Sequence, residues 1–226
     1  MISVDVSKKL KAGHLPLSLR VKLQVQKGSV TCIQGPSGTG KTSLLKIIAG
    51  LMQPDAGCIK VDGHTWLDTG AGISLSPQQR MAGFVFQNYA LFPNMTAEQQ
   101  LTYATKDHAW ISHLLHIGKL IHLETHRPEY LSGGQQQRLA ILRARAIKPR
   151  LLLMDEPFGA LDPITRTHVR NDFVNLEEFK KKTIVLVTHD VQEAFELADR
   201  VCLMDKGKIV QVGTPTELLF KPENDF

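Results

Sequence analysis

The chain has 226 residues, of which 42% are hydrophobic, and its 27 basic and 22 acidic side chains give a net charge of +5. This length suits one or two domains with a sizeable core. No apolar run approaches the roughly 20 residues of a membrane-spanning helix, and no basic stripe interleaved with aromatic residues indicates nucleic acid. The three isolated cysteines, Cys32, Cys58 and Cys202, lack disulfide or metal spacing, so we expect a reducing compartment.

The N-terminal part, residues 1 to about 67, is predicted to be rich in β-structure. Alternating apolar residues start at Met1 without a signal peptide. Residues 29–34 are β-branched and apolar, as a buried strand should be, and residues 43–49 have helical composition. A Gly-rich loop therefore lies between a predicted strand and a predicted helix.

That loop reads Gly35-Pro36-Ser37-Gly38-Thr39-Gly40-Lys41-Thr42. It fits the phosphate-loop pattern, in which glycines let successive backbone N–H groups surround a phosphate. Lys41 would reach the β- and γ-phosphates, Thr42 would place its hydroxyl on Mg²⁺, and Ser43 belongs to the same nucleotide-binding set. The alternative is a tight Gly-rich turn with no ligand.

Residues 88 to about 130 are predicted to leave the core as a helical lobe, because Leu114, Leu115, Ile117, Leu120 and Ile121 recur near helical spacing. Ser132, Gly133 and Gly134 then open a helix expected over residues 135–146, and its N-terminus can bind an anion.

The apolar run 151–154 ends abruptly in Asp155 and Glu156. Ligands bind at the carboxyl ends of parallel strands. Asp155 is the candidate for Mg²⁺ through its water shell, and Glu156 is the candidate general base for an attacking water. The alternative is that the two carboxylates only cap the turn before Pro157.

The segment Leu131-Ser132-Gly133-Gly134-Gln135-Gln136-Gln137-Arg138 resembles the signature of ATP-binding-cassette (ABC) ATPases. Phe86-Gln87 resembles the Q-loop of that family, Gly159-Ala160-Leu161-Asp162 its D-loop and Val187-Thr188-His189-Asp190 its switch histidine. The resemblance covers almost the whole chain. It predicts an α/β fold, a P-loop NTPase ABC cassette with a parallel-sheet core, an antiparallel β subdomain and an inserted helical subdomain. Residues 88–138 would form the helical subdomain, and residues 1–87 and 139–226 the core with the β subdomain.

The resemblance further implies that the chain is an ATPase whose cofactors are ATP and Mg²⁺. Two copies would form a head-to-tail homodimer, with each ATP between the phosphate loop of one copy and Ser132, Gly133, Gly134 and Gln135 of the other. By resemblance, Gln87 senses metal and water, His189 contacts the γ-phosphate and Asp162 bridges the two sites. Family members commonly stack adenine on an aromatic residue before the phosphate loop, but residues 1–34 contain no Phe, Tyr or Trp. His14 is the nearest planar candidate, and it could equally be an ordinary turn residue.

Residues 72–96 are similar to the ATPase subunits of molybdate and sulfate-type importers. An oxyanion importer is therefore expected, with molybdate or tungstate ahead of sulfate as the solute, peripheral to the cytoplasmic face of the membrane. Its partners would be a multi-span permease contacted by residues 88–96 and, indirectly, a solute-binding protein, with no nucleic acid. A different small solute, or a stand-alone regulatory or repair ATPase, remains the alternative. Because the chain stops at Phe226, the C-terminal regulatory domain usual in such importers is not expected.

Two clusters of residues can be interpreted either as functional sites or as ordinary solvent-exposed segments. His108, His113, His116, His122 and His126 lie close together and could suggest Zn²⁺, but no carboxylate or cysteine completes a tight site. A solvent-facing helical lobe is the alternative. The basic run of residues 180–182 is read as a solvated connection, with a lipid headgroup contact as the other reading.

Overall fold

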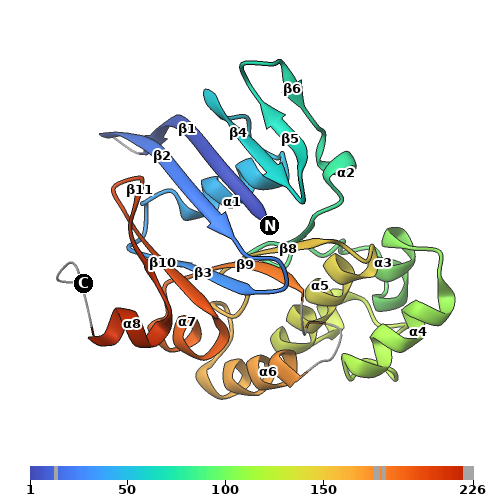
Figure 1. Cartoon of the computed structure of the whole chain (residues 1–226). Helices are drawn as coiled ribbons and strands as arrows, with labels where there is room; N and C mark the ends of the chain where they lie inside the picture. Colours follow the sequence, from blue (N-terminus) through green and yellow to red (C-terminus); the bar gives the residue numbers. More distant parts are fainter. Residues whose placement is uncertain (13–14, 176–178, 180–181, 221–226) are drawn as a thin grey trace.

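The structure is a computed structural model that describes residues 1–12, 15–175, 179 and 182–220. Figure 1 shows two sheets, with a helix between them and further helices on the outer side of the second sheet. The two sheets and the helix between them share one hydrophobic core, to which Val4, Leu44 and Leu153 all contribute.

The first sheet is antiparallel, and its strands lie in the order β2-β1-β4-β5-β6. Its strands are β1 (Ile2–Ala12), β2 (Leu15–Val25), β4 (Ala56–Val61), β5 (His64–Asp68) and β6 (Ile73–Ser74). In β1, Ile2, Val4 and Val6 are buried while Asp5 is exposed. This alternation gives the sheet one face toward the core and one toward solvent.

The second sheet has the order β11-β10-β3-β9-β8-β7 and is parallel except for the β10–β11 hairpin. Its strands are β3 (Val30–Gln34), β7 (Gly83–Val85), β8 (Leu151–Asp155), β9 (Thr183–Thr188), β10 (Arg200–Asp205) and β11 (Lys208–Gly213). Every residue of β8 and β9 is buried, as expected for strands covered on both faces. Adjacent parallel strands bring the carboxyl ends of β3, β9 and β8 to one edge.

The helices are α1 (Lys41–Ala49), α2 (Pro77–Arg80), α3 (Ala97–Ala104), α4 (His108–Ile117), α5 (Gly133–Ala146), α6 (Pro163–Asn175), α7 (Val191–Leu197) and α8 (Pro215–Phe220), with a 3-10 turn over Pro128–Tyr130. Helix α1 lies between the sheets, and α5 and α6 cover the other face of the parallel sheet (Figure 1). The parallel-sheet core and the antiparallel β subdomain predicted from the sequence are both present.

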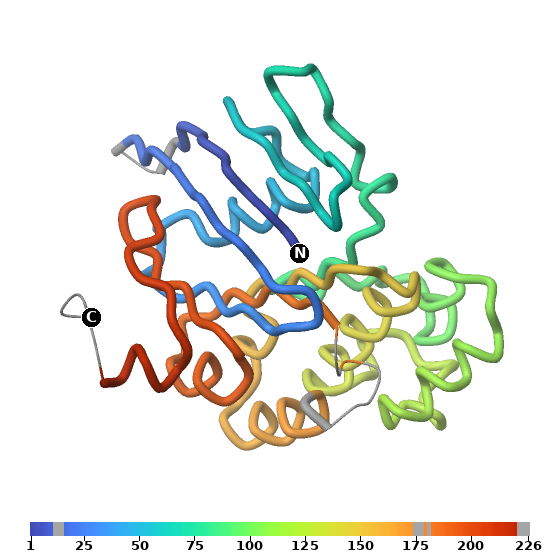
Figure 2. Tube along the Cα trace, viewed as in Figure 1, coloured from blue at the N-terminus to red at the C-terminus, as the bar shows by residue number. Residues whose placement is uncertain are grey.

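The helical lobe follows the predicted path. In Figure 2 the chain leaves the sheets, forms α3 and α4, and returns to the sheets through α5. Its own core joins α3, α4 and α5. The predicted helical spacing extends too far, because α4 ends at Ile117 and Gly118 caps it. Leu120 is nevertheless buried, whereas Ile121 is exposed. Helix α5 runs unbroken through residue 138, and the division into residues 88–138 and the flanking core remains a prediction.

Among the described residues, no helix is long and apolar enough to cross a membrane. The described part of the chain likewise has no group of three or more His, Cys, Asp or Glu side chains placed to hold a metal ion. Cys32, Cys58 and Cys202 are free thiols. His14 and two residues of the basic run, Lys180 and Lys181, lie outside the described residues.

Candidate functional site

The phosphate loop joins β3 to α1, as the sequence predicts. Gly40 has φ 100° immediately before α1, a left-handed conformation that favours glycine. At Gly35, a Cβ would overlap the carbonyl oxygen of Met204, so this position has no room for a side chain. The loop is therefore held against both the β1–β2 hairpin and β10.

Lys41 is only 5% exposed, and its ammonium group lies folded onto the loop. Its Nζ donates to the carbonyl oxygens of Gly35 and Pro36, at 2.7 and 2.8 Å. Burial lowers the pKa of this ammonium, and the nearby carboxylates of Glu156 and Asp155 oppose that shift. The desolvated cation thus donates to neutral carbonyl groups, which the oxygens of an anionic phosphate could replace.

Asp155 ends β8 and is 4% exposed. Its Oδ1 accepts a hydrogen bond from Thr42 Oγ1 at 2.8 Å. Burial is the main cause that raises the pKa of Asp155, and the charge of Glu156 raises it further, while the Thr42 hydrogen bond lowers it. A carboxylate and a hydroxyl side by side are hard oxygen ligands, so these two residues fit Mg²⁺.

Glu156, Gln87 and His189 meet at one carboxylate oxygen. Gln87 Nε2 donates to Glu156 Oε2 at 2.9 Å, and His189 Nδ1 lies 3.2 Å from the same oxygen. Glu156 has φ 45°, and its backbone N–H donates to the carbonyl of Val187 on β9. The strained backbone turns Glu156 away from the strand toward the two other side chains.

The phosphate loop and this cluster line one pocket of about 710 Å³. Its predicted residues are Ser37, Gly38, Gly40, Lys41, Thr42, Ser43, Gln87, Glu156 and His189. Five further lining residues were not predicted from the sequence: Lys8, Lys9, Leu10, Leu17 and Met52. The alternation of side chains along a strand could have suggested which residues of β1 and β2 face inward. Nothing in the local sequence indicates that these residues lie over the phosphate loop.

The signature segment and Asp162 lie apart from this pocket, whose lining includes none of them. Ser132 caps α5, since its Oγ accepts from Gln135 N–H and Gln135 Oε1 accepts from Ser132 N–H at 2.8 Å. Asp162 caps α6 in the same way by accepting from Thr165 N–H at 3.0 Å, and hydrogen bonds from Thr165 lower its pKa. One copy of the chain therefore brings together the phosphate loop, Asp155, Glu156, Gln87 and His189, whereas the signature segment and Asp162 lie outside that pocket.

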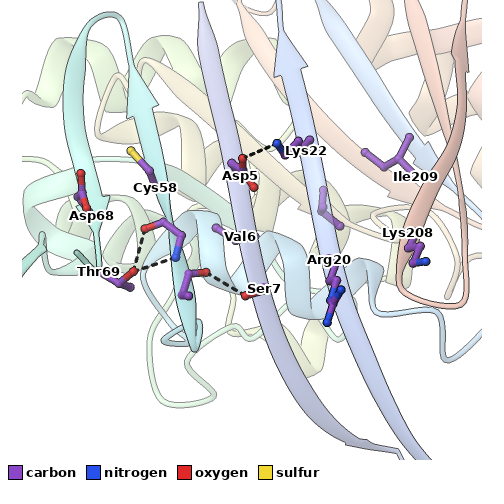
Figure 3. A pocket seen from close by; sticks show the side chains of 13 residues that line it. Asp5, Val6, Ser7, Arg20, Lys22, Cys58, Asp68, Thr69, Lys208 and Ile209 are labelled. Atoms are coloured by element: carbon purple, nitrogen blue, oxygen red, sulfur yellow. Dashed lines mark hydrogen bonds and ion pairs between the residues drawn. The ribbon is translucent and has the colours of Figure 1, made fainter. Parts of the chain in front are cut away.

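A larger hollow of about 780 Å³ lies on the solvent face of the antiparallel sheet. Figure 3 shows that Asp5, Lys22, Arg20 and Lys208 line it, with an exposed Lys22–Asp5 ion pair of 3.2 Å. No residue of the sequence motifs lines this hollow. The chemistry of the motifs therefore belongs to the pocket at the phosphate loop.

Comparison with known proteins decides the family. The family model for ABC transporters matches residues 19–159. The chain belongs to the ABC transporter family. It is a cassette of the ABC ATPase class, which hydrolyses ATP, and ATP and Mg²⁺ are its cofactors, as predicted.

The individual relatives are ATP-binding proteins of transport systems. The chain is 43% identical over 231 residues to the choline transport ATP-binding protein OpuBA of Bacillus subtilis, an alignment that covers 98% of this chain and 59% of the relative. It is 42% identical over 222 residues to the sulfate/thiosulfate import ATP-binding protein CysA of Thermosynechococcus vestitus, covering 95% of this chain and 64% of the relative. The chain thus spans less than two thirds of the length of these relatives.

A solved structure of an ATP-binding cassette dimer in a post-hydrolysis state, bound to ADP and Pi, has a TM-score of 0.78 to this structure. The sequences are 31% identical, and the match covers 95% of this chain and 99% of that chain.

Proposed function

We propose that this chain is the ATP-binding and ATP-hydrolysing subunit of an ABC importer. The observation that carries the proposal is the meeting of Gln87 and His189 at the Glu156 carboxylate, in the pocket that also contains Lys41. A carboxylate held by two partners beside a phosphate loop suits a base that accepts a proton from a water attacking the γ-phosphate.

The roles of the residues follow from their positions. Lys41 binds the phosphates, with backbone N–H groups of residues 35–40 and the N-terminus of α1. Asp155 and Thr42 would hold Mg²⁺, which supplies charge neutralisation on the phosphates when bound. Gln87 orients Glu156, and His189 binds the γ-phosphate.

The second half of the site comes, in this proposal, from a second copy. Ser132, Gly133, Gly134 and Gln135 at the start of α5 would close over the γ-phosphate of the partner, and Asp162 would link the two pockets. The exposure of Ser132 and Gly133 supports this arrangement, as does the similarity to a cassette solved as a dimer.

Residues 88–96 are proposed to contact a multi-span permease, which would hold the subunit at the cytoplasmic face of the membrane. Phe92 is 38% exposed, its ring lies 5.1 Å from that of the exposed Tyr103, and Arg143 lies 5.2 Å from it. Gln100 fixes this segment by donating to Phe92 O at 2.7 Å and accepting from Phe92 N–H. The result is an ordered, partly apolar surface suited to a partner helix.

The transported solute is proposed to be an oxyanion, with sulfate better supported than molybdate or tungstate because sulfate/thiosulfate import proteins are 42–44% identical relatives in the cassette. An osmoprotectant such as choline is the second candidate, favoured by the 43% identity to OpuBA. A solute-binding protein would deliver either one.

The variant Glu156→Gln tests the catalytic proposal. It should retain ATP binding and accumulate a closed dimer with ATP, because the amide keeps the side-chain shape but cannot accept the proton. Lys41→Ala should lose ATP binding. Gel filtration with and without ATP measures the dimer, and turnover close to that of the unchanged protein would remove Glu156 from the role of base.

A further inference from the structure

A further cavity, of about 250 Å³, lies on the side of the parallel sheet that faces α6. Met154 of β8 and Ile184 and Leu186 of β9 form its sheet wall. Phe158, Phe173 and Phe179 line it from the opposite layer. It shares no lining residue with the pocket at the phosphate loop.

Three aromatic rings gather at this cavity. Phe173 lies 6.1 Å from Phe158 and 4.4 Å from Phe179, measured between ring centroids. The three side chains are at most 8% exposed. Protein interiors are close-packed, and an apolar cavity of about 150 Å³ already admits benzene. A cavity of this volume therefore has room for a compact organic group.

Two opposite charges line the same cavity. Asp199 Oδ2 accepts the backbone N–H of Val30 at 2.8 Å, which fixes the carboxylate beside the cavity. Lys182 also lines the cavity and is half-buried. The described lining thus combines three aromatic rings with one carboxylate and one ammonium group.

We propose that this cavity binds a small zwitterion with a quaternary ammonium group, whose methylated cation enters among the phenylalanine rings and whose carboxylate stays near Lys182. Aromatic rings attract such cations through their negative faces, and the attraction is larger in a desolvated site. Asp199 adds negative charge to the lining, and Lys182 pairs with the carboxylate.

The chemistry of the wall distinguishes this ligand from two others. A primary ammonium carries three N–H donors, and beyond the Asp199 carboxylate a wall of phenylalanine and aliphatic side chains would leave the remaining donors unsatisfied. A quaternary ammonium has no N–H to satisfy. A simple apolar carboxylate would use the rings and Lys182 but would be repelled by Asp199.

Glycine betaine and its neutral isostere 3,3-dimethylbutanoate, in which carbon replaces the nitrogen, are the matched probes. Protein labelled with ¹³C at the methionine methyl groups reports the place of binding, because Met154 lines the cavity and the other five methionines do not. We expect glycine betaine to shift the Met154 signal saturably and the isostere to bind at least tenfold more weakly, the ratio that about 1.4 kcal/mol of cation–π attraction gives. Equal binding of the two, or no saturable shift at Met154, would overturn the proposal.

Variants test the two charges separately. Asp199→Asn keeps an oxygen for Val30 N–H and removes only the charge, so it should weaken both glycine betaine and choline. Lys182→Gln should weaken glycine betaine but leave choline, which has no carboxylate, unchanged. Lys208→Gln, on the distant sheet face, is the control. If neither Asp199→Asn nor Lys182→Gln changes the affinity for glycine betaine or choline, the ligand does not bind between these charges. The titration needs no nucleotide, so its failure would leave the ATPase proposal intact.

Discussion

Arg80 gives the sharpest stability prediction. It is 3% exposed, although it is an arginine. Its Nη1 donates to the carbonyls of Ile47 and Ile48 at 2.8 Å each, and its Nε donates to Leu75 O at 3.0 Å. The last carbonyls of a helix have no partner within the helix. Arg80 therefore caps the end of α1 opposite to the phosphate loop.

The magnitude follows from these contacts. Three hydrogen bonds at about 1 kcal/mol each, with a few tenths more from the helix dipole, sum to about 3 kcal/mol after the cost of burying the cation. For a chain of this size, each kcal/mol shifts Tm by about 2–4 °C. Arg80→Met should therefore lower Tm by about 6–12 °C. Arg80→Lys keeps the charge but not the planar guanidinium, so its Tm should lie between those of the unchanged protein and Arg80→Met.

Scanning calorimetry of the purified chain measures the shift. Arg150→Met is the matched control, because Arg150 is exposed. A loss of less than about 2 °C in Arg80→Met, or an equal loss in the control, would refute the idea that the buried guanidinium holds α1.

Three further predictions concern the pocket and the permease surface. Burial raises the pKa of Asp155 in the folded state, so ionisation of Asp155 lowers the stability once the pH exceeds the pKa of the unfolded chain. Asp155→Asn should therefore raise Tm at pH 7, and the difference in Tm should shrink as the pH falls below the unfolded pKa. The same variant should lose Mg²⁺-dependent hydrolysis. Among the described lining residues, leucines rather than an aromatic ring lie beside the loop, so GTP should support hydrolysis within about tenfold of ATP, and His14→Ala should change this ratio little. Steady-state kinetics showing a hundredfold ATP preference would contradict this. Cysteines placed at Leu91 or Asn94 should crosslink to the permease in assembled complexes, and capture of the ATPase alone would count against that surface.

The strand–loop–helix around Lys41 and the strand ending at Asp155 could be predicted because their signals are local: an apolar run, then glycines or carboxylates. The predicted start of α5 at residue 135 is two residues late, although Ser132 and Gln135 form a capping box that the sequence displays. Thr96 and Gln99 form the same box at the start of α3. Cap residues were thus a stronger boundary signal than helical composition.

Leu10 and Leu17 could not be placed from sequence, because their position depends on two long-range relations. They face each other in the β1–β2 register, and both approach the site of a Cβ at Gly40. A hydrophobic alternation predicts that such residues face a core, but not which segment of the chain lies there. The wall of the pocket beside the phosphate loop is therefore a property of the tertiary packing.

The cluster at Glu156 shows the same limit for the predicted catalytic residues. Each of Gln87, Glu156 and His189 follows a strand, and the sequence indicates that much. Their contact requires that β7, β8 and β9 be neighbours, which the sheet order provides although β7 and β9 lie far apart in the chain. Parallel strands then bring the three following residues to one edge. The order of strands, more than any single motif, sets the 2.9 and 3.2 Å distances at the Glu156 carboxylate.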